Sequence, residues 1–420
     1  MREMKDSGIS WVGEIPKEWS VNRAKYCFVN TKEIAGCRSD RYERLALTMN
    51  GVIKRSKDDS NGLQPEKFET YQILRPDELV FKLIDLQNVS TSRVGLSPYL
   101  GLVSPAYIIL KSNKRILPAF AEKYFLMLWK NQIFNALGDA GVRSNLNSKD
   151  LLELSIPFPS LDEQQRIAEF LDRECGKIDG LKADIQTQID TLEQYKRSII
   201  TEAVTHGLNP SAPMKDSGIN YISEHPIHWS LRRLKYILNE RNERSVTGTE
   251  ELLSVSLYKG VIPSTEMTNR TMQADSLIGY KRVYKGDLVF NKLNPGMARF
   301  GCSDYDGITS PDFAVYIVNE NYCNAKFLQY LLKTDFYVEK IKSVSMGVGD
   351  GFTRLYSNQL YEFFVALPPR DEVSIIINYL DNKCAEIEQI IADKESQIET
   401  LDGYKKSLIY EYVTGKKEVM

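Results

Sequence analysis

The chain has 420 residues, enough for two or more domains, and its 42% apolar content is typical of a soluble globular protein. No apolar run approaches the roughly 18 residues that a membrane-spanning helix requires, and the opening MREMKDSGIS lacks the apolar region of a signal peptide. Six cysteines without CxxC spacing indicate free thiols in a reducing compartment, so we expect a cytoplasmic protein.

Charge is distributed unevenly, although the net charge is only −2. Residues 1–155 hold 23 basic and 18 acidic residues, and residues 207–368 hold 18 and 17. Residues 160–206 and 369–420, by contrast, each have a net charge of −4. The acidic excess therefore lies on two segments. The rest of the chain has a mild basic excess, which permits a phosphate-binding surface without requiring one.

The opening of the chain occurs twice. Residues 4–26 read MKDSGISWVGEIPKEWSVNRAKY, and residues 214–236 read MKDSGINYISEHPIHWSLRRLKY, with 13 of 23 positions identical. Together with the helical repeat described below, this makes the chain a tandem duplication of a globular unit followed by a helix. Trp19 and Trp229 occupy equivalent places, and we interpret both as packing anchors.

The interiors of the two globular units agree only in patches. Equivalent strands are predicted at 45–49 and 253–257, at 51–53 and 260–262, at 78–81 and 287–290, and after 101–105 and 307–311 up to Leu110 and Val318. A helix at 124–134 or 327–337, a glycine-containing loop at 138–144 or 347–353, and a last strand up to Pro157 or Pro368 follow. We therefore expect an α+β fold in which one scaffold presents two different recognition surfaces.

Each unit ends in a long predicted helix, Leu161 to Thr205 and Arg370 to Thr414, with 20 of 45 positions identical. At about 1.5 Å per residue, each helix would be roughly 65 Å long. Apolar residues recur every seven positions, with further apolar residues such as Leu181, Ile189, Tyr195, Ile390 and Tyr404 between them. This spacing predicts a coiled-coil seam formed by Leu171, Ile178, Ile185, Leu192, Ile199, Leu380, Ile387, Leu401 and Leu408.

Two local features qualify the helix prediction. Ser160 and Glu163 have the spacing of a capping box, which the second copy lacks. Lys394 stands where the first copy has Ile185, so it either fixes the register or marks a place where the seam opens. An alternative is that the two helices are amphipathic and buried in separate cores, but their shared seam pattern favours packing against each other.

No catalytic constellation is evident. His225 and His228 lie three positions apart without a third ligand, and His206 stands alone. The glycine-containing stretch 347–351 lacks the lysine and hydroxyl of a phosphate-binding loop. Residues 294–297 lack the second proline and the aromatic residue of the adenine-methyltransferase motif. We therefore predict no catalytic, cofactor-binding or metal-binding residues in this chain.

Basic and amide side chains gather in loops at corresponding places of both units. Arginine can read guanine, asparagine can read adenine, and lysine can hold phosphates. Any one of these side chains alone would be interpreted as a solvated surface charge, and only the grouping favours DNA contact. The candidate contacts are Lys54, Arg55, Lys57, Arg93, Arg143, Lys292, Asn294, Arg299 and Arg354.

The doubled MKDSGI…W opening and the doubled DE…LD…Y-K helix resemble the DNA-specificity subunit of type I restriction-modification systems over essentially the whole chain. The resemblance implies target-recognition domains at 1–158 and 208–368, each reading half of a split, asymmetric site in double-stranded DNA. It implies helices at 159–207 and 369–416 that form an antiparallel coiled coil, set the spacer and dock two methyltransferase subunits. A motor-nuclease subunit completes the complex, and S-adenosylmethionine, ATP and Mg belong to the partners.

Physical reasoning agrees with this resemblance. A dimer of identical readers imposes a palindromic site, whereas duplication within one chain lets the two halves diverge. If the helices act as a ruler, four residues added to one helix, about 6 Å, would change the preferred spacer or abolish binding. The alternatives are a coiled-coil protein adaptor without DNA binding, an enzyme in its own right, and a complex that methylates DNA without restricting it.

Overall fold

The computed structural model describes residues 2–59, 67–86, 93–137, 145–256, 260–267, 276–347 and 351–419. The chain divides into two compact units, one formed by Met1–Gln186 with Glu395–Met420 and the other by Thr187–Lys394. Each unit therefore combines one globular domain with half of each long helix. This division differs from the four consecutive segments predicted from the sequence, because both helices are shared between the units.

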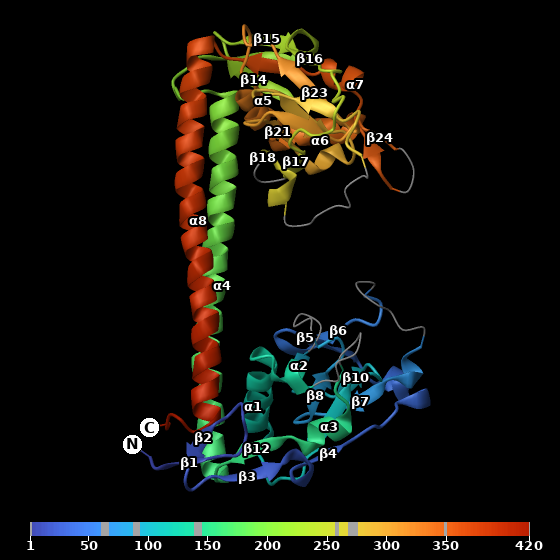
Figure 1. The fold of residues 1–420 in the computed structure, drawn as a ribbon, viewed down its shortest axis with the longest axis vertical. Helices are drawn as coiled ribbons and strands as arrows, with labels where there is room; N and C mark the ends of the chain where they lie inside the picture. The colour runs from blue at the N-terminus through green and yellow to red at the C-terminus, as the bar shows by residue number, and fades with distance from the viewer. Residues whose placement is uncertain are drawn as a thin grey trace. The chain divides into compact units, whose positions relative to one another are not determined.

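The first unit contains twelve strands among its described residues, arranged mainly in two four-stranded sheets of order β6-β5-β10-β7 and β4-β11-β8-β9 (Figure 1). Its helices are α1 (Pro118–Lys130), α2 (Ile133–Leu137), α3 (Ser148–Glu153) and the start of α4 (Leu161–Thr205). The strands are β1 (Met4–Asp6), β2 (Glu14–Pro16), β3 (Ser20–Arg23), β4 (Phe28–Asn30), β5 (Arg44–Thr48), β6 (Gly51–Arg55), β7 (Gln72–Leu74), β8 (Leu79–Lys82), β9 (Arg93–Leu96), β10 (Gly101–Val103), β11 (Ile108–Ser112) and β12 (Ser155–Phe158).

The second unit repeats the sheet built around β8, in the order β16-β23-β20-β21. Its helices are α5 (Ala325–Leu332), α6 (Asp335–Val344), α7 (Ser357–Tyr361) and the start of α8 (Arg370–Val413). The strands are β13 (Met214–Ile219), β14 (Ile222–Pro226), β15 (Ser230–Arg233), β16 (Leu238–Glu240), β17 (Leu253–Ser256), β18 (Gly260–Pro263), β19 (Lys281–Val283), β20 (Leu288–Asn291), β21 (Phe300–Cys302), β22 (Gly307–Thr309), β23 (Phe313–Val318), β24 (Met346–Gly347), β25 (Thr353–Arg354) and β26 (Phe364–Leu367).

The sequence predicted the central strands correctly but not the extent of the helix in each domain. The stretches 78–81 and 287–290 correspond to β8 and β20, which pair on both sides. The single helix expected at 124–134 is instead α1 and α2, separated by Asn131 and Gln132, of which Gln132 has a φ of 57°. The equivalent stretch is α5 and α6, separated by Lys333 and Thr334. The prediction missed both breaks, because the apolar periodicity continues across them.

The domain cores include the ends of the long helices. In the first unit, buried Phe125 and Leu128 of α1 belong to the same apolar cluster as Leu171 and Ile178 of α4 and Leu408 of α8. The second unit repeats this arrangement with α5, the start of α8 and the end of α4. The ends of the long helices are therefore buried in separate domain cores, as the alternative interpretation proposed. The middle parts of the two helices cover each other.

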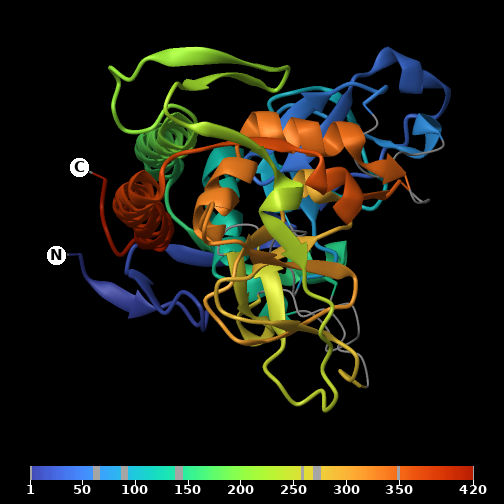
Figure 2. The same ribbon diagram turned by 90° about the horizontal axis from the view of Figure 1, so that it is seen from above.

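The two helices pair in antiparallel fashion within each unit, and Figures 1 and 2 show them side by side. In the first unit, Asp179 pairs with Lys405 at 2.7 Å and Lys182 with Asp402 at 2.5 Å, so the partner number falls as the residue number rises. In the second unit, Lys196 pairs with Glu388. This ion pair is the repeat equivalent of Asp179–Lys405 with the two helices exchanged, so both units contain the same contact.

The predicted seam is buried to different degrees. Leu171, Ile178, Leu380, Ile387 and Leu408 are buried, and they lie near the globular domains. The remaining seam residues, Ile185, Leu192, Ile199 and Leu401, are half-buried because only two helices cover them.

Four apolar residues between the seam positions face solvent instead of the seam. Leu181 is 53% exposed, Tyr195 58%, Ile390 44% and Tyr404 57%. Lys394, the exception in the seam, donates to Gln188 Oε1 at 2.5 Å, so an amide of the opposite helix satisfies its charge.

A tryptophan–glutamate clasp joins each domain to the first turn of its own long helix. Trp19 is 1% exposed, and its Nε1 donates to Glu163 at 2.9 Å, whereas Trp229 donates to Glu372 at 3.2 Å. Both tryptophans are thus packing anchors, as predicted. The capping box is only half formed. Ser160 Oγ accepts from the backbone N–H of Glu163 at 3.3 Å, but the Glu163 carboxylate binds Trp19 and Arg2 instead of returning to the cap.

Each clasp also meets the end of the other long helix. A Cβ added at Gly415, which has a φ of +70°, would lie 2.9 Å from the Trp19 ring and would collide with Pro16. A Cβ added at Gly207, with a φ of +79°, would lie 2.8 Å from Glu372. Only glycine allows this backbone conformation and this close approach without strain. Both helix ends are therefore fixed to the clasp of a domain.

We expect Trp19→Phe to reduce the free energy of unfolding by about 1–3 kcal/mol, because the buried Glu163 loses a hydrogen-bond donor. The matched change Trp229→Phe should cost less, since the Glu372 side chain is 26% exposed and keeps its contact with His228. Urea unfolding of both variants tests this order. Equal losses would show that ring volume, and not the indole N–H, determines the effect.

Candidate nucleic-acid interface

Four equivalent positions lie together at one end of the central strands in each unit, and we name them the strand-end cluster. The first cluster is built on paired Lys82 and Arg93, at the end of β8 and the start of β9. In the second, Asn291 of β20 donates its backbone N–H to the carbonyl of Arg299 at 3.0 Å. The clusters consist of Lys82, Asp85, Arg93 and Asn145 in the first unit, and of Asn291, Asn294, Arg299 and Arg354 in the second.

A bridge between two distant segments completes each cluster. Ile84 forms an isolated β-bridge with Asn145, and Leu293 forms the same bridge with Arg354. The residue after each bridge partner has a left-handed backbone, with a φ of 56° at Asp85 and 47° at Asn294. Non-glycine residues adopt this conformation at a cost, which surrounding contacts must offset. Both copies keep it, although one has aspartate and the other asparagine.

An asparagine side chain stabilises the bridge in both units. It belongs to the second bridge residue in the first unit and to the left-handed turn in the second unit. In the first unit, Asn145 Oδ1 accepts the backbone N–H of Asp85 at 3.3 Å. In the second unit, Asn294 Oδ1 accepts the backbone N–H of Thr353 at 3.1 Å. Each side-chain amide is therefore held in place by backbone that is 59 or 60 residues away in sequence.

Lys292, which lies beside the second cluster, is close enough to other cations to be repelled by them. Arg354 lies 3.6 Å from Asp312, a long ion pair, and its side chain is 26% exposed. Burial lowers the pKa of Lys292, and the nearby cations Lys281 and Arg354 lower it further. Burial and then Arg93 likewise lower the pKa of Lys82 in the first cluster. A ligand with negative charge would relieve this repulsion in both units.

The space behind the two bridges differs between the units. In the first unit, Asn145 lines a pocket of about 310 Å³ together with Asn30, Gln72 and Tyr107. In the second, Lys281 stands at the position equivalent to Gln72 and donates to Glu240 at 2.9 Å. Burial opposes ionisation of Glu240, but hydrogen bonds from Ser357 and Lys281 outweigh it and lower its pKa.

The predicted contacts Lys54, Arg55 and Lys57 do not join the first strand-end cluster. They line a separate pocket of about 460 Å³ at the far end of the β5–β6 hairpin. Lys54 pairs with Glu43 at 2.7 Å, Arg55 pairs with Asp59 at 2.7 Å, and Lys57 lies 3.8 Å from Asp40. These carboxylates offset much of the positive charge, so this group is a weaker candidate than the cluster.

The remaining predicted contacts divide as follows. Arg93 joins the first cluster and donates Nη1 to the carbonyl of Leu47 at 3.0 Å. Asn294, Arg299 and Arg354 form the second cluster, with Lys292 beside them. Arg143 lies outside the described residues.

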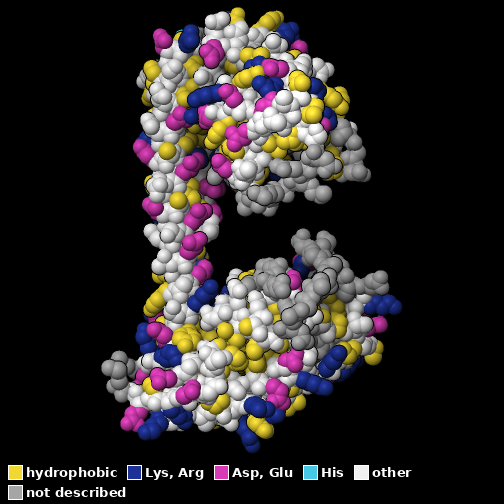
Figure 3. All heavy atoms as spheres, viewed as in Figure 1, with side chains coloured by type: hydrophobic (Ala, Val, Ile, Leu, Met, Phe, Trp, Pro, Cys, Tyr) yellow, Lys and Arg dark blue, Asp and Glu magenta, His cyan; other side chains and the backbone are white. Residues whose placement is uncertain are grey.

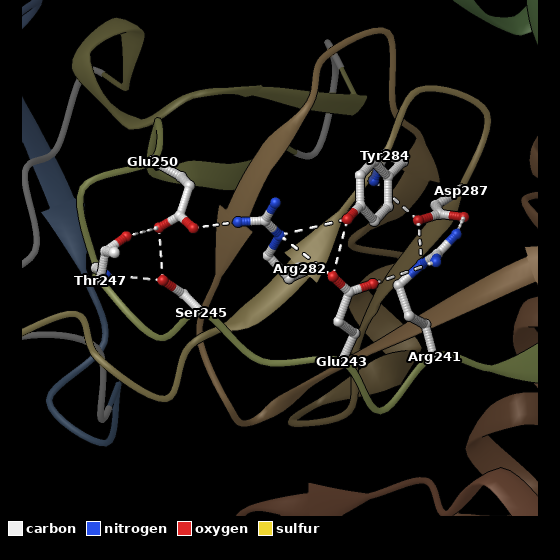
Figure 4. A network of polar contacts seen from close by, with 9 residues as sticks. Arg241, Glu243, Ser245, Thr247, Glu250, Arg282, Tyr284 and Asp287 are labelled. Carbon is white, nitrogen blue, oxygen red and sulfur yellow. Dashed lines mark hydrogen bonds and ion pairs between the residues drawn. The ribbon is translucent and has the colours of Figure 1, made fainter.

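Two other arginines of the second unit, Arg241 and Arg282, belong to a network of polar contacts within that unit, which Figure 4 shows. Arg241 binds Asp287 through two hydrogen bonds of 2.9 Å, and Arg282 pairs with Glu250. Tyr284 donates to Glu243 at 2.9 Å. At the equivalent positions of the first unit, Arg75 donates to Glu33 at 2.5 Å. This network joins segment 241–250 to β19, so its guanidinium groups serve the fold.

The sequence analysis missed Lys82, Asp85, Asn145 and Asn291. A signal was present, since Asn145 lies 209 positions before Arg354, the spacing of the helix repeat, and Lys82 and Asn291 follow matching strands. The predicted contacts are basic loop residues and one amide, Asn294, so they do not include carboxylates, residues at strand ends or the other loop amides.

The histidines and the proline-containing turn have structural surroundings. His225 is fully buried, with Nδ1 2.8 Å from the carbonyl of Pro226, and His228 lies 2.8 Å from Glu372. Pro295–Met297 forms a short 3-10 turn after Asn294. Across the described ranges, no group of three or more His, Cys, Asp or Glu residues could hold a metal ion, and no helix is long and apolar enough to cross a membrane.

Comparisons with known proteins agree on one family. Residues 54–191 match the family model for the type I restriction modification DNA specificity domain. The putative MjaX specificity subunit of Methanocaldococcus jannaschii is 24% identical, over 97% of this chain and 96% of its own length. The MjaVIII specificity subunit of the same organism is 22% identical, over 76% and 75%.

A solved structure shows the same fold. One of its chains, from work on complex assembly and conformational transition of the type I R-M system, aligns with a TM-score of 0.66. The alignment covers 96% of this chain and 99% of that one at 13% identity. At this identity the likeness establishes the fold alone.

Proposed function

We propose that this chain, which belongs to the specificity subunits of type I restriction-modification systems, recognises DNA sequence for a larger complex through its two domains. Each domain would read one half of a split, asymmetric site. The chain itself would be non-catalytic. S-adenosylmethionine, ATP and Mg would belong to two methyltransferase subunits and a motor-nuclease subunit. The comparisons do not favour a coiled-coil adaptor that does not bind DNA.

The strand-end clusters carry this proposal. Two domains with the same strands, the same bridge and the same left-handed turn present different side chains at equivalent places. Scaffolds that only fill space would not need strained turns at both places. Arginine, lysine and asparagine at such places can bind base edges and phosphates. The partner methyltransferase would have to take its target base out of the duplex.

A genome-wide map of methylated bases tests the proposal, using cells that express this chain with its methyltransferase subunit. The control cells lack only this chain. We expect a split, asymmetric motif that disappears in the control. An unchanged map, with the assembled complex shown by co-purification, would contradict the proposed function.

The paired helices are proposed to set the spacer between the two half-sites. One heptad could be inserted in each helix, between Gln186 and Thr187 and between Lys394 and Glu395, where the two units divide. The seam pattern would continue, and each helix would lengthen by about 10.5 Å. At about 3.4 Å per base pair, the methylated motif should gain roughly three base pairs of spacer. An unchanged spacer would refute the ruler.

The exposed apolar residues on the coil are proposed to dock the methyltransferase subunits. Leu181 and Ile390 are repeat equivalents, as are Tyr195 and Tyr404, so each unit presents one aliphatic and one tyrosine side chain. Figure 3 shows hydrophobic and acidic side chains together on the helices. Two matching surfaces suit two copies of one partner, since large side chains exposed at repeat-equivalent places indicate a protein interface.

We expect Tyr404→Glu to reduce the complex from two methyltransferase subunits to one, because a charge on one docking surface leaves the other intact. Tyr195→Glu should have the same effect, and the double variant should bind none. The control is Lys406→Glu, an exposed position about 200° further round the helix. Native mass spectrometry measures the stoichiometry. Two bound subunits in the double variant would place the docking surface elsewhere.

A further inference from the structure

The two bridges offer a direct comparison of side chains on one backbone geometry. In both units the second bridge residue, Asn145 or Arg354, precedes a buried leucine. In the first unit, the backbone N–H of Leu146 donates to the carbonyl oxygen of Leu83, just after β8, at 3.2 Å. In the second unit, the backbone N–H of Leu355 donates to the carbonyl oxygen of Lys292, just after β20, at 3.1 Å. The bridge and this hydrogen bond therefore hold position 145 or 354 against the residues that follow β8 or β20.

The side chains at this fixed position differ in the chemistry that reads bases. Asn145 carries an amide, which can bind the N6 and N7 atoms of adenine, whereas Arg354 carries a guanidinium group, which can bind O6 and N7 of guanine. The turn residue opposite differs too, as Asp85 in the first unit and Asn294 in the second. The backbone is conserved between the copies, and the hydrogen-bonding pattern is not.

Both side chains are prepared for contact with a ligand. The amide of Asn145 is oriented by its bond to Asp85 N, and its residue is exposed. Arg354 is partly exposed above the ring of Tyr356, 5.9 Å from its centroid, and its Nη2 lies 3.6 Å from Asp312 Oδ1. Side chains held in place before binding lose less conformational entropy on contact.

We propose that positions 145 and 354 are the base-selecting positions of the two domains, with Asp85 and Asn294 orienting the segments that carry them. This inference rests on the proposed function and adds which residues determine each half-site. The flanking cations Lys82, Arg93 and Arg299 would hold phosphates, which carry no sequence information.

The reciprocal exchange of the two side chains tests the proposal. Asn145→Arg should change the preferred base at one position of the half-site read by the first domain, from adenine toward guanine, and leave the other half-site unchanged. Arg354→Asn should do the converse. Discrimination between the old and new base should shift by about 10- to 100-fold, the effect of one bidentate contact. The readout is the methylation map together with binding of the purified complex to a library of sites.

A more conservative substitution at position 145 reduces the risk that the variant misfolds. Asn145→Asp keeps the oxygen that accepts the backbone N–H of Asp85 and replaces the donor amide by a second acceptor. It should shift preference from adenine toward cytosine, because a carboxylate accepts from cytosine N4. The controls are Lys111→Asn and Lys285→Asn, exposed cations at the opposite ends of β8 and β20, which should leave the motif unchanged.

The outcomes are distinguishable. If the wild-type chain directs a motif and all three variants methylate that same motif with unchanged base preference, positions 145 and 354 do not select bases, although the proposed function holds. If the wild-type chain directs no motif, the proposed function itself fails. A changed base in only the expected half-site establishes the assignment, because the other half-site reports that the complex is intact.

Discussion

The hydrogen bond from a buried indole to a helix-initial glutamate is the constraint on which the rest of the structure depends. Trp19 with Glu163 and Trp229 with Glu372 hold each domain against the start of its own helix, while Gly415 and Gly207 bring in the end of the other. In both copies, loss of the glutamate would leave the N–H of a buried indole without this acceptor.

Because the helices are fixed in this way, both units keep the same backbone arrangement while their side chains can differ. Ion pairs repeat the same attachment, with Lys123 bound to Asp172 at 2.5 Å and Lys326 bound to Asp381 at 2.8 Å. In both units the central sheet ends at the same strained turn and bridge, beneath different side chains. Duplication thus separates the backbone features that both units share from the side chains that differ between them.

The cations of the domains fall into two groups with different physical roles. Arg241, Arg282 and Arg75 are paired with carboxylates and contribute to the fold. Lys82 and Lys292 have lowered pKa values, because burial disfavours their charge and neighbouring cations reinforce the effect. A polyanion would favour the charged form of these two lysines, whereas the charge of the paired arginines is screened by their own carboxylates.

The sequence alone determined the duplication, the long helices with their seam and the central strands, because periodicity and internal repeats are local properties of the chain. The resemblance indicated the function that we propose. Tertiary structure decided which loop residues meet. Lys54 and Arg93 look alike in sequence, yet one lies among carboxylates and the other at the strand ends. Asn145 joins Asp85 only through a bridge across 60 residues, and no local pattern records such a contact.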